Sequence, residues 1–259
     1  MLRVFLSAAW TGVSMDYKTY KMTALMKCKY GLLYLLLFIF LGRLFYGSLL
    51  AGLPGLLLIP LALRKKAAQL ADKRRHELAL EFKELVLAYA NALRAGYSVE
   101  NAFLEAAKEI AYLFDEDALI MQECRQMAGK MKNGHSIEEL LTDLGRRSGS
   151  EDIADFAAVF SVAKRSGGNM PAIMSDTAGR ISEKVSLTEE ISLMFAQKRL
   201  EQRMMDVLPL AIMLYISIAS PGYFSSLYGN VTGIVVMTVC LAVYVAAYLI
   251  SGKIMDIRI

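Results

Sequence analysis

Two long apolar stretches lie toward the ends of the chain, and a segment rich in charged residues separates them. No charged residue occurs from residue 207 to residue 251, and these 45 residues can hold two membrane-spanning helices of about 20 residues each. The break between them is predicted near Pro221 and Gly222, because proline and glycine form turns. The sequence therefore predicts a transmembrane hairpin over residues 207–251.

The N-terminal apolar stretch, residues 30–63, is shorter and contains one charged residue, Arg43. Two spans in this length would each have about 17 residues, which is the lower limit for a membrane helix. We expect a tight hairpin of two short spans that turns between Arg43 and Ser48. One long, tilted helix is the alternative, and it would change the topology.

The middle segment has the spacing of amphipathic helices. Apolar residues recur every three or four positions, as in Phe82, Leu85, Val86 and Tyr89, and no window alternates with a period of two. Short connections between these helices predict an all-α, antiparallel six-helix bundle. The expected domains are an N-terminal segment (1–29), a transmembrane hairpin (30–63), the six-helix bundle (64–206), a second transmembrane hairpin (207–251) and a C-terminal tail (252–259).

A short pattern occurs three times in the middle segment, as "LRAGYSVENAF" from Leu93, "MKNGHSIEELL" from Met131 and "KRSGGNMPAIM" from Lys164. A glycine in the left-handed conformation ends a helix, and a following Ser or Asn caps the start of the next one. The pattern therefore predicts three helix-to-helix turns, built on Gly96, Ser98, Gly134, Ser136, Gly167 and Asn169.

Basic residues stand just before each of these turns: Arg94, Lys132, Lys164 and Arg165. In an up-and-down bundle whose first helix rises from the membrane, all three turns are expected at the end far from the bilayer. The cations can stabilise helix C-termini through the helix dipole. They can also form a basic surface for an acidic cytosolic partner, and the two roles are compatible.

The distribution of charge predicts the topology. Lys and Arg cluster before and after the first apolar stretch, before the last one and near the C-terminus, whereas the turns between spans hold only Arg43. The positive-inside rule then places both termini and the middle domain of a multi-pass membrane protein in the cytoplasm. The middle segment has 21 basic and 23 acidic residues, so the basic excess of a nucleic-acid-binding protein is absent.

Motifs for catalysis are missing. The chain has no phosphate-binding loop, and its two histidines, His76 and His135, lie outside any zinc-protease motif. The acidic turn 115–117 lacks the spacing of a calcium loop. The apolar stretches carry no charged side chain except Arg43, which disfavours a transporter. We expect no catalytic site, no metal site and no cofactor.

The three ordered glycine turns, followed by a long helix that leads into "VLPLAIMLYISIASPGYFSSLY", resemble the F domain of type II secretion systems, over roughly residues 78–221. A single copy between apolar hairpins resembles the TadB and TadC platform proteins of tight-adherence (Flp/Tad) pilus machines. Three segments favour the TadB-like branch: "SPGYF" after the third span, the ending "GKIMDIRI", and "DYKTYKM" from Asp16, which is similar to the start of TadB-like chains of Gram-positive bacteria.

The resemblance implies a non-enzymatic platform protein of the inner membrane, of the kind found in protein secretion, type IV pilus and Flp pilus machines. Its partners would be a TadA-like secretion ATPase, a second F-domain protein (TadC-like), pilin subunits and lipid, in a homo- or hetero-oligomer without nucleic acid. Its role would be to couple the ATPase to pilin assembly. A TadC-like protein, another membrane-anchored scaffold and a small membrane transporter are the alternatives.

Overall fold

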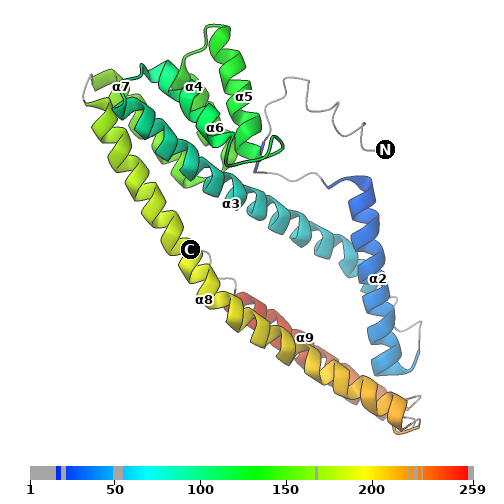
Figure 1. Cartoon of the computed structure of the whole chain (residues 1–259). Helices are drawn as coiled ribbons and strands as arrows, with labels where there is room; N and C mark the ends of the chain where they lie inside the picture. The colour runs from blue at the N-terminus through cyan, green and yellow to red at the C-terminus, as the bar shows by residue number, and fades with distance from the viewer. Residues whose placement is uncertain are drawn as a thin grey trace. The chain divides into compact units, whose positions relative to one another are not determined.

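The fold is helical throughout the part of the chain that the structure describes (Figure 1). The computed structural model describes residues 16–18, 22–48, 55–166, 169–220, 222–224, 227–228 and 230–255. No strand occurs in these residues. The all-α fold class predicted from the helical spacing of apolar residues is confirmed.

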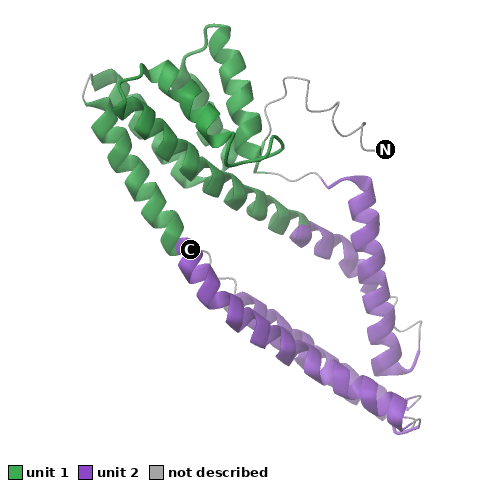
Figure 2. Cartoon of the chain, in the orientation of Figure 1, with its two compact units in different colours: residues 1–21, 67–187 green, residues 22–66, 188–259 purple. Residues whose placement is uncertain are grey.

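The chain divides into two compact units (Figure 2). Unit 1 comprises residues 1–21 and 67–187, and unit 2 comprises residues 22–66 and 188–259. Two long helices contribute to both units, because the boundaries at residues 66–67 and 187–188 fall inside them.

Unit 1 contains residues from six helices within the described part of the chain. They are α3 (Ile59–Arg94), α4 (Val99–Ile110), α5 (Leu119–Lys132), α6 (Ile137–Ser148), α7 (Glu151–Ser166) and α8 (Met170–Ala219). Short connections of two to eight residues join them, as predicted from the turn patterns. The cytoplasmic location and the antiparallel bundle arrangement stay predictions.

The core of unit 1 is built around aromatic side chains from three helices. Phe82 and Tyr89 of α3, Phe103 of α4, and Phe156 and Phe160 of α7 are all buried. The rings of Phe82 and Phe156 meet edge to face, with centroids 5.4 Å apart. Truncating one buried phenylalanine to alanine costs about 3–5 kcal/mol in a well-packed core. The helical spacing that predicted these helices therefore corresponds to one shared apolar core.

Unit 2 contains α2 (Ala24–Tyr46), the C-terminal part of α8 and α9 (Val231–Met255). These three are the helices in the described residues that are long and apolar enough to cross a membrane. Leu44 and Phe45 of α2 are buried with Met237 of α9, and Leu210 and Met213 of α8 pack against them. All three candidate spans thus share one apolar contact.

The N-terminal apolar stretch contains one candidate span in the described residues, and the predicted hairpin of two short spans stays a prediction. Helix α2 begins at Ala24 and ends at Tyr46, where Gly47 adopts the left-handed conformation, so a single helix over residues 30–63 is absent. Helix α3 begins only at Ile59, and the basic residues 64–66 follow soon after, so its apolar part is too short for a candidate span. Residues 49–54 lie outside the described part of the chain.

Helix α8 runs without a break from Met170 to Ala219, as predicted for a last bundle helix that continues into the third span. Its 50 residues correspond to a length of about 75 Å at 1.5 Å per residue. The N-terminal part buries Met174, Ala178, Ile181 and Val185 in the core of unit 1. Pro209 lies inside the helix and removes the N–H that would bind the carbonyl of Met205.

Candidate functional site

Two of the three predicted helix-to-helix turns have the expected geometry. Gly96 and Gly134 adopt left-handed conformations, with φ of 91° and 89°. Two residues after each glycine, the hydroxyl of Ser98 or Ser136 accepts the backbone N–H three positions ahead, at 3.4 and 3.5 Å. Each glycine therefore ends one helix, and each serine caps the next.

The third turn is described only in part. Helix α7 ends at Ser166, and α8 begins at Met170. The side-chain oxygen of Asn169 accepts the N–H of Ala172 at 3.3 Å, which is the predicted cap. Gly167 lies outside the described residues.

Ion pairs bring the three turns to one end of unit 1. At the end of α7, Lys164 lies 3.6 Å from Glu100 in the first turn of α4. The next residue, Arg165, lies 2.8 Å from Glu138 in the first turn of α6. The end of α7 therefore lies beside the starts of α4 and α6. We call residues 94–98, 132–136 and 164–166 the turn end of unit 1.

The four predicted cations of the turn end fall into two classes. Lys164 and Arg165 are engaged by carboxylates, and hydrogen bonds from Ser161 and Arg165 lower the pKa of Glu138. Arg94 and Lys132 are exposed, and neither forms an ion pair with any residue that the structure describes. Only Arg94 and Lys132 are therefore available to a partner without breaking an internal contact.

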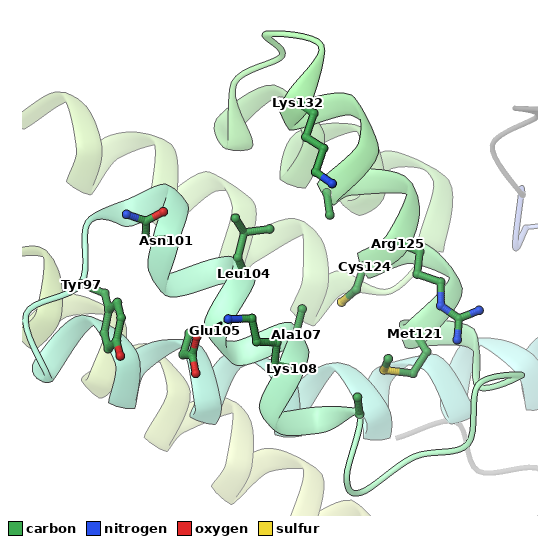
Figure 3. Close-up of a pocket in the computed structure, with 12 residues that line it drawn as sticks. Tyr97, Asn101, Leu104, Glu105, Ala107, Lys108, Met121, Cys124, Arg125 and Lys132 are labelled. Carbon is green, nitrogen blue, oxygen red and sulfur yellow. Dashed lines mark hydrogen bonds and ion pairs between the residues drawn. The ribbon is translucent and has the colours of Figure 1, made fainter.

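A groove of about 600 Å³ lies between α4 and α5 (Figure 3). Its lining includes Leu104, Ala107 and Met121, together with the basic side chains of Lys108, Arg125 and Lys132. Part of this positive charge is neutralised, because Lys108 pairs with Glu105 and Arg125 pairs with Glu116. The groove thus combines an apolar lining with basic side chains.

The groove contains one thiol, but its environment suppresses nucleophilic chemistry. Cys124 is buried, and burial raises the pKa of its thiol to about 12, with the nearby Glu123 acting in the same direction. A cysteine is reactive as the thiolate, so this side chain is inert at neutral pH. Within the described ranges, no group of three His, Cys, Asp or Glu side chains is arranged to hold a metal ion.

A buried ionic network joins α5, α6 and the N-terminal segment. Glu123 of α5 is 1% exposed, and Arg147 of α6 donates to both of its carboxylate oxygens, at 3.0 and 2.8 Å. Arg147 also donates to Asp143 at 2.7 Å. The hydroxyl of Tyr17 donates to Glu123 at 2.7 Å. The carboxylate of Glu123 thus accepts three hydrogen bonds inside the fold.

The network was not predicted from the sequence, although one signal for it exists. Glu123 falls on the apolar face of α5 formed by Ile120, Cys124 and Met127, where a carboxylate needs a buried partner. Its partner Arg147 is 24 residues away, and Tyr17 is 106 residues away. Pairing over such distances depends on the tertiary fold.

The predicted transmembrane turn connects α8 and α9. Helix α8 ends at Ala219, α9 begins at Val231, and Gly222 between them has a φ of 108°. Pro221 lies outside the described residues. Within unit 2, the hydroxyl of Tyr244 donates to the carbonyl of Asp206 at 2.6 Å, close to Pro209.

Comparison with protein families gives one match. The family model for the type II secretion system protein F matches residues 85–218, slightly more than half of the chain, and this range includes all three turns, the groove and the Glu123, Asp143 and Arg147 members of the ionic network. Neither the curated proteins nor the solved structures contain a match to the chain. The chain belongs to the protein F family of type II secretion systems, whose members are non-catalytic membrane platform proteins of secretion and pilus machines.

Proposed function

We propose that this chain is the TadB-like platform subunit of a tight-adherence (Flp/Tad) pilus machine in the bacterial cytoplasmic membrane. It couples a cytosolic ATPase to the assembly of pilin subunits and has no catalytic activity of its own. Proteins of its family work with secretion ATPases and with other platform proteins in membrane assemblies. The specific partners are a TadA-like ATPase, a TadC-like platform protein and a pilin.

The continuity of α8 is the observation that carries this proposal. One helix supplies Met174 and Val185 to the core of unit 1, and Leu210 and Met213 to the apolar cluster of unit 2. A continuous helix transmits displacement along its axis because every turn is hydrogen-bonded to the next. ATPase motion that reaches unit 1 is therefore passed to the candidate spans, where pilins are handled.

The proposed topology places both termini and unit 1 in the cytoplasm. The basic clusters around residues 64–66 and 198–203 support it, since Lys and Arg are retained on the cytoplasmic side of a membrane. This topology requires an even number of crossings before unit 1, as in the predicted transmembrane hairpin over residues 30–63.

The proposed contact with the ATPase is the turn end, through Arg94 and Lys132. These two cations are exposed, whereas Lys164 and Arg165 are occupied by Glu100 and Glu138. An acidic partner surface gains charge-assisted contacts from them, and such contacts chiefly raise the association rate at low salt.

Crosslinking in the native host, followed by affinity capture of the tagged chain in mild detergent, tests the proposal. We expect a secretion ATPase with a phosphate-binding loop, a second F-domain protein and a prepilin in the captured material. Capture of the chain alone, under conditions in which the pilus proteins are expressed, would contradict the platform role. Substrate flux in liposomes that contain only this chain would instead favour the transporter.

Charge reversal at Arg94 and Lys132 tests whether the turn end is the contact with the ATPase. Arg94→Glu combined with Lys132→Glu is expected to reduce capture of the ATPase while leaving the second F-domain protein bound. Lys73→Glu is the matched control, because Lys73 is an exposed cation of α3 outside the turn end. Equal loss of the ATPase in both variants would show that the effect is general and not a property of the turn end.

A further inference from the structure

Within the described residues 16–18, the N-terminal segment is docked on unit 1 through the buried side chain of Tyr17. Tyr17 is 4% exposed, although its neighbours Asp16 and Lys18 are exposed. Its backbone N–H donates to the carbonyl of Arg147 at 3.1 Å, and its hydroxyl donates to Glu123 at 2.7 Å. Burial raises the pKa of Tyr17 and the adjacent Glu123 raises it further, so the hydroxyl stays a proton donor. Backbone and side chain together therefore define one docked position.

The receiving site is complete without the tyrosine. Arg147 holds both oxygens of Glu123 and is itself oriented by Asp143 on the same helix. These three residues lie within residues 85–218, the range of the family match, whereas Tyr17 lies outside it. The segment thus binds to a preformed site on the family domain, from a part of the chain that the family match does not include.

The chain beyond the docked tyrosine is short. Helix α2, the first candidate span, begins at Ala24, seven residues after Tyr17. Seven extended residues reach at most about 25 Å. A tyrosine held at Glu123 therefore limits how far the start of α2 can move from α5 and α6.

We propose that residues 16–18 form a releasable strap, in which Tyr17 binds the Glu123–Arg147 site and tethers the first membrane span to the family domain. The strap is a further connection between this domain and the spans, separate from the two helices α3 and α8 that continue from one unit into the other. Its release frees the start of α2 while the ion pair keeps the site intact. This inference rests on the contacts of Tyr17 and on chain length, and it is independent of the identity of the machine.

Hydrogen–deuterium exchange of the full chain in lipid nanodiscs tests the docking. In the wild type, we expect slow exchange of the Tyr17 amide. Tyr17→Phe removes only the hydroxyl, and loss of a hydrogen bond to a charged group is expected to speed exchange of residues 16–18 on the order of 10-fold. Tyr17→Ala also removes the buried ring and is expected to give the larger effect. Tyr112→Phe, at a tyrosine that is 92% exposed, is the matched control and leaves exchange unchanged.

The same experiment reports whether the variants fold. Amides of α5 and α6 are expected to stay protected in Tyr17→Phe and Tyr17→Ala, because the receiving site keeps its own ion pair. Fast exchange of residues 16–18 in the wild type would overturn the proposal. Unchanged exchange in Tyr17→Ala, with α5 and α6 protected, would overturn it equally.

A distance measurement tests the tether itself. Nitroxide labels at Leu25→Cys on α2 and Thr142→Cys on α6 occupy exposed positions, in a background from which the three native cysteines have been removed. We expect a narrow distance distribution with Tyr17 and a clearly broader one with Tyr17→Ala. Equal widths in both proteins would show that the strap does not restrain α2.

Discussion

The guanidinium of Arg147 and the carboxylate of Glu123 form a bidentate ion pair inside unit 1, with donor–acceptor distances of 3.0 and 2.8 Å. The side chain of Arg147 is 10% exposed, whereas that of its neighbour Arg146 is 78% exposed. Two adjacent arginines therefore occupy opposite environments. Removing one partner of a buried pair leaves an uncompensated charge, which costs far more than loss of a surface pair.

Replacement of these two arginines is expected to have very different effects on stability. Arg147→Ala should lower the free energy of unfolding by about 3–5 kcal/mol, which corresponds to a drop in melting temperature on the order of 10 °C for a chain of this size. Arg146→Ala should change it by less than about 1 kcal/mol. Thermal unfolding of the full chain in detergent measures both, and similar losses in the two variants would contradict a buried ionic network.

The turn glycines are expected to resist substitution for conformational reasons alone. A Cβ at Gly96 or Gly134 would meet nothing within 4 Å, but both residues have positive φ. Gly134→Ala should therefore cost about 1–2 kcal/mol. Gly129→Ala is the matched control on α5, because that position is equally open and has an ordinary helical φ, so alanine should stabilise it by about 0.5–1 kcal/mol. Opposite signs in thermal unfolding would confirm the prediction.

Gly47 is expected to be sensitive for a steric reason as well. It has a φ of 65°, and an added Cβ would lie 2.7 Å from the ring of Tyr228. The hydroxyl of Tyr228 also donates to the carbonyl of Leu44. Gly47→Ala should therefore loosen the contact between α2 and the segment before α9, and lower the melting temperature in detergent. Gly31→Ala, in open space on the same helix, should have no such effect.

Stability is expected to fall at acidic pH through Asp143. Burial alone would raise the pKa of this carboxyl, but hydrogen bonds from Arg147 and Arg146 outweigh that effect and lower it below its ordinary value of 3.8. A carboxyl with a lowered pKa in the folded state contributes stability above its unfolded pKa and loses it as the pH falls further. Asp143→Asn should flatten the dependence of melting temperature on pH below about 4. An unchanged slope would contradict this assignment.

Interrupting α8 is expected to abolish pilus assembly without abolishing binding of the ATPase. Ser192→Pro removes a helical N–H at an exposed position between the parts of α8 that pack in unit 1 and unit 2, and it bends or breaks the helix. Under the proposed function, pilus assembly should be lost while the ATPase is still captured. Ser192→Ala should retain both activities. Normal pilus assembly with Ser192→Pro would contradict transmission through α8.

Several features of the candidate site followed from local sequence, and others did not. The turns at Gly96 and Gly134 were predictable because glycine and the serine two residues later act on their own helix ends. The division of the four cations was not predictable, since Lys164 finds Glu100 and Arg165 finds Glu138 only after α4, α6 and α7 have packed.

The structure of the N-terminal region could be predicted only in part from local sequence. Hydropathy indicated an apolar stretch from residue 30, but α2 begins earlier, at Ala24, and so includes Lys27 and Lys29. The docking of Tyr17 could not be predicted from local sequence, because nothing in its neighbours indicates a buried partner. A family resemblance indicated the domain, and the family match over residues 85–218 confirmed it.

The sequence by itself determined the helical fold, the two turns and the division into apolar and charged segments, because periodicity, capping and hydropathy act over a few neighbouring residues. Only the tertiary structure decided which charges are paired, that Glu123 is buried against Arg147, and that Tyr17 docks beside them. The physical reason is the separation in sequence between the residues that interact. A buried charge must find its partner in space, and in this chain the partners come from helices and segments far apart in sequence.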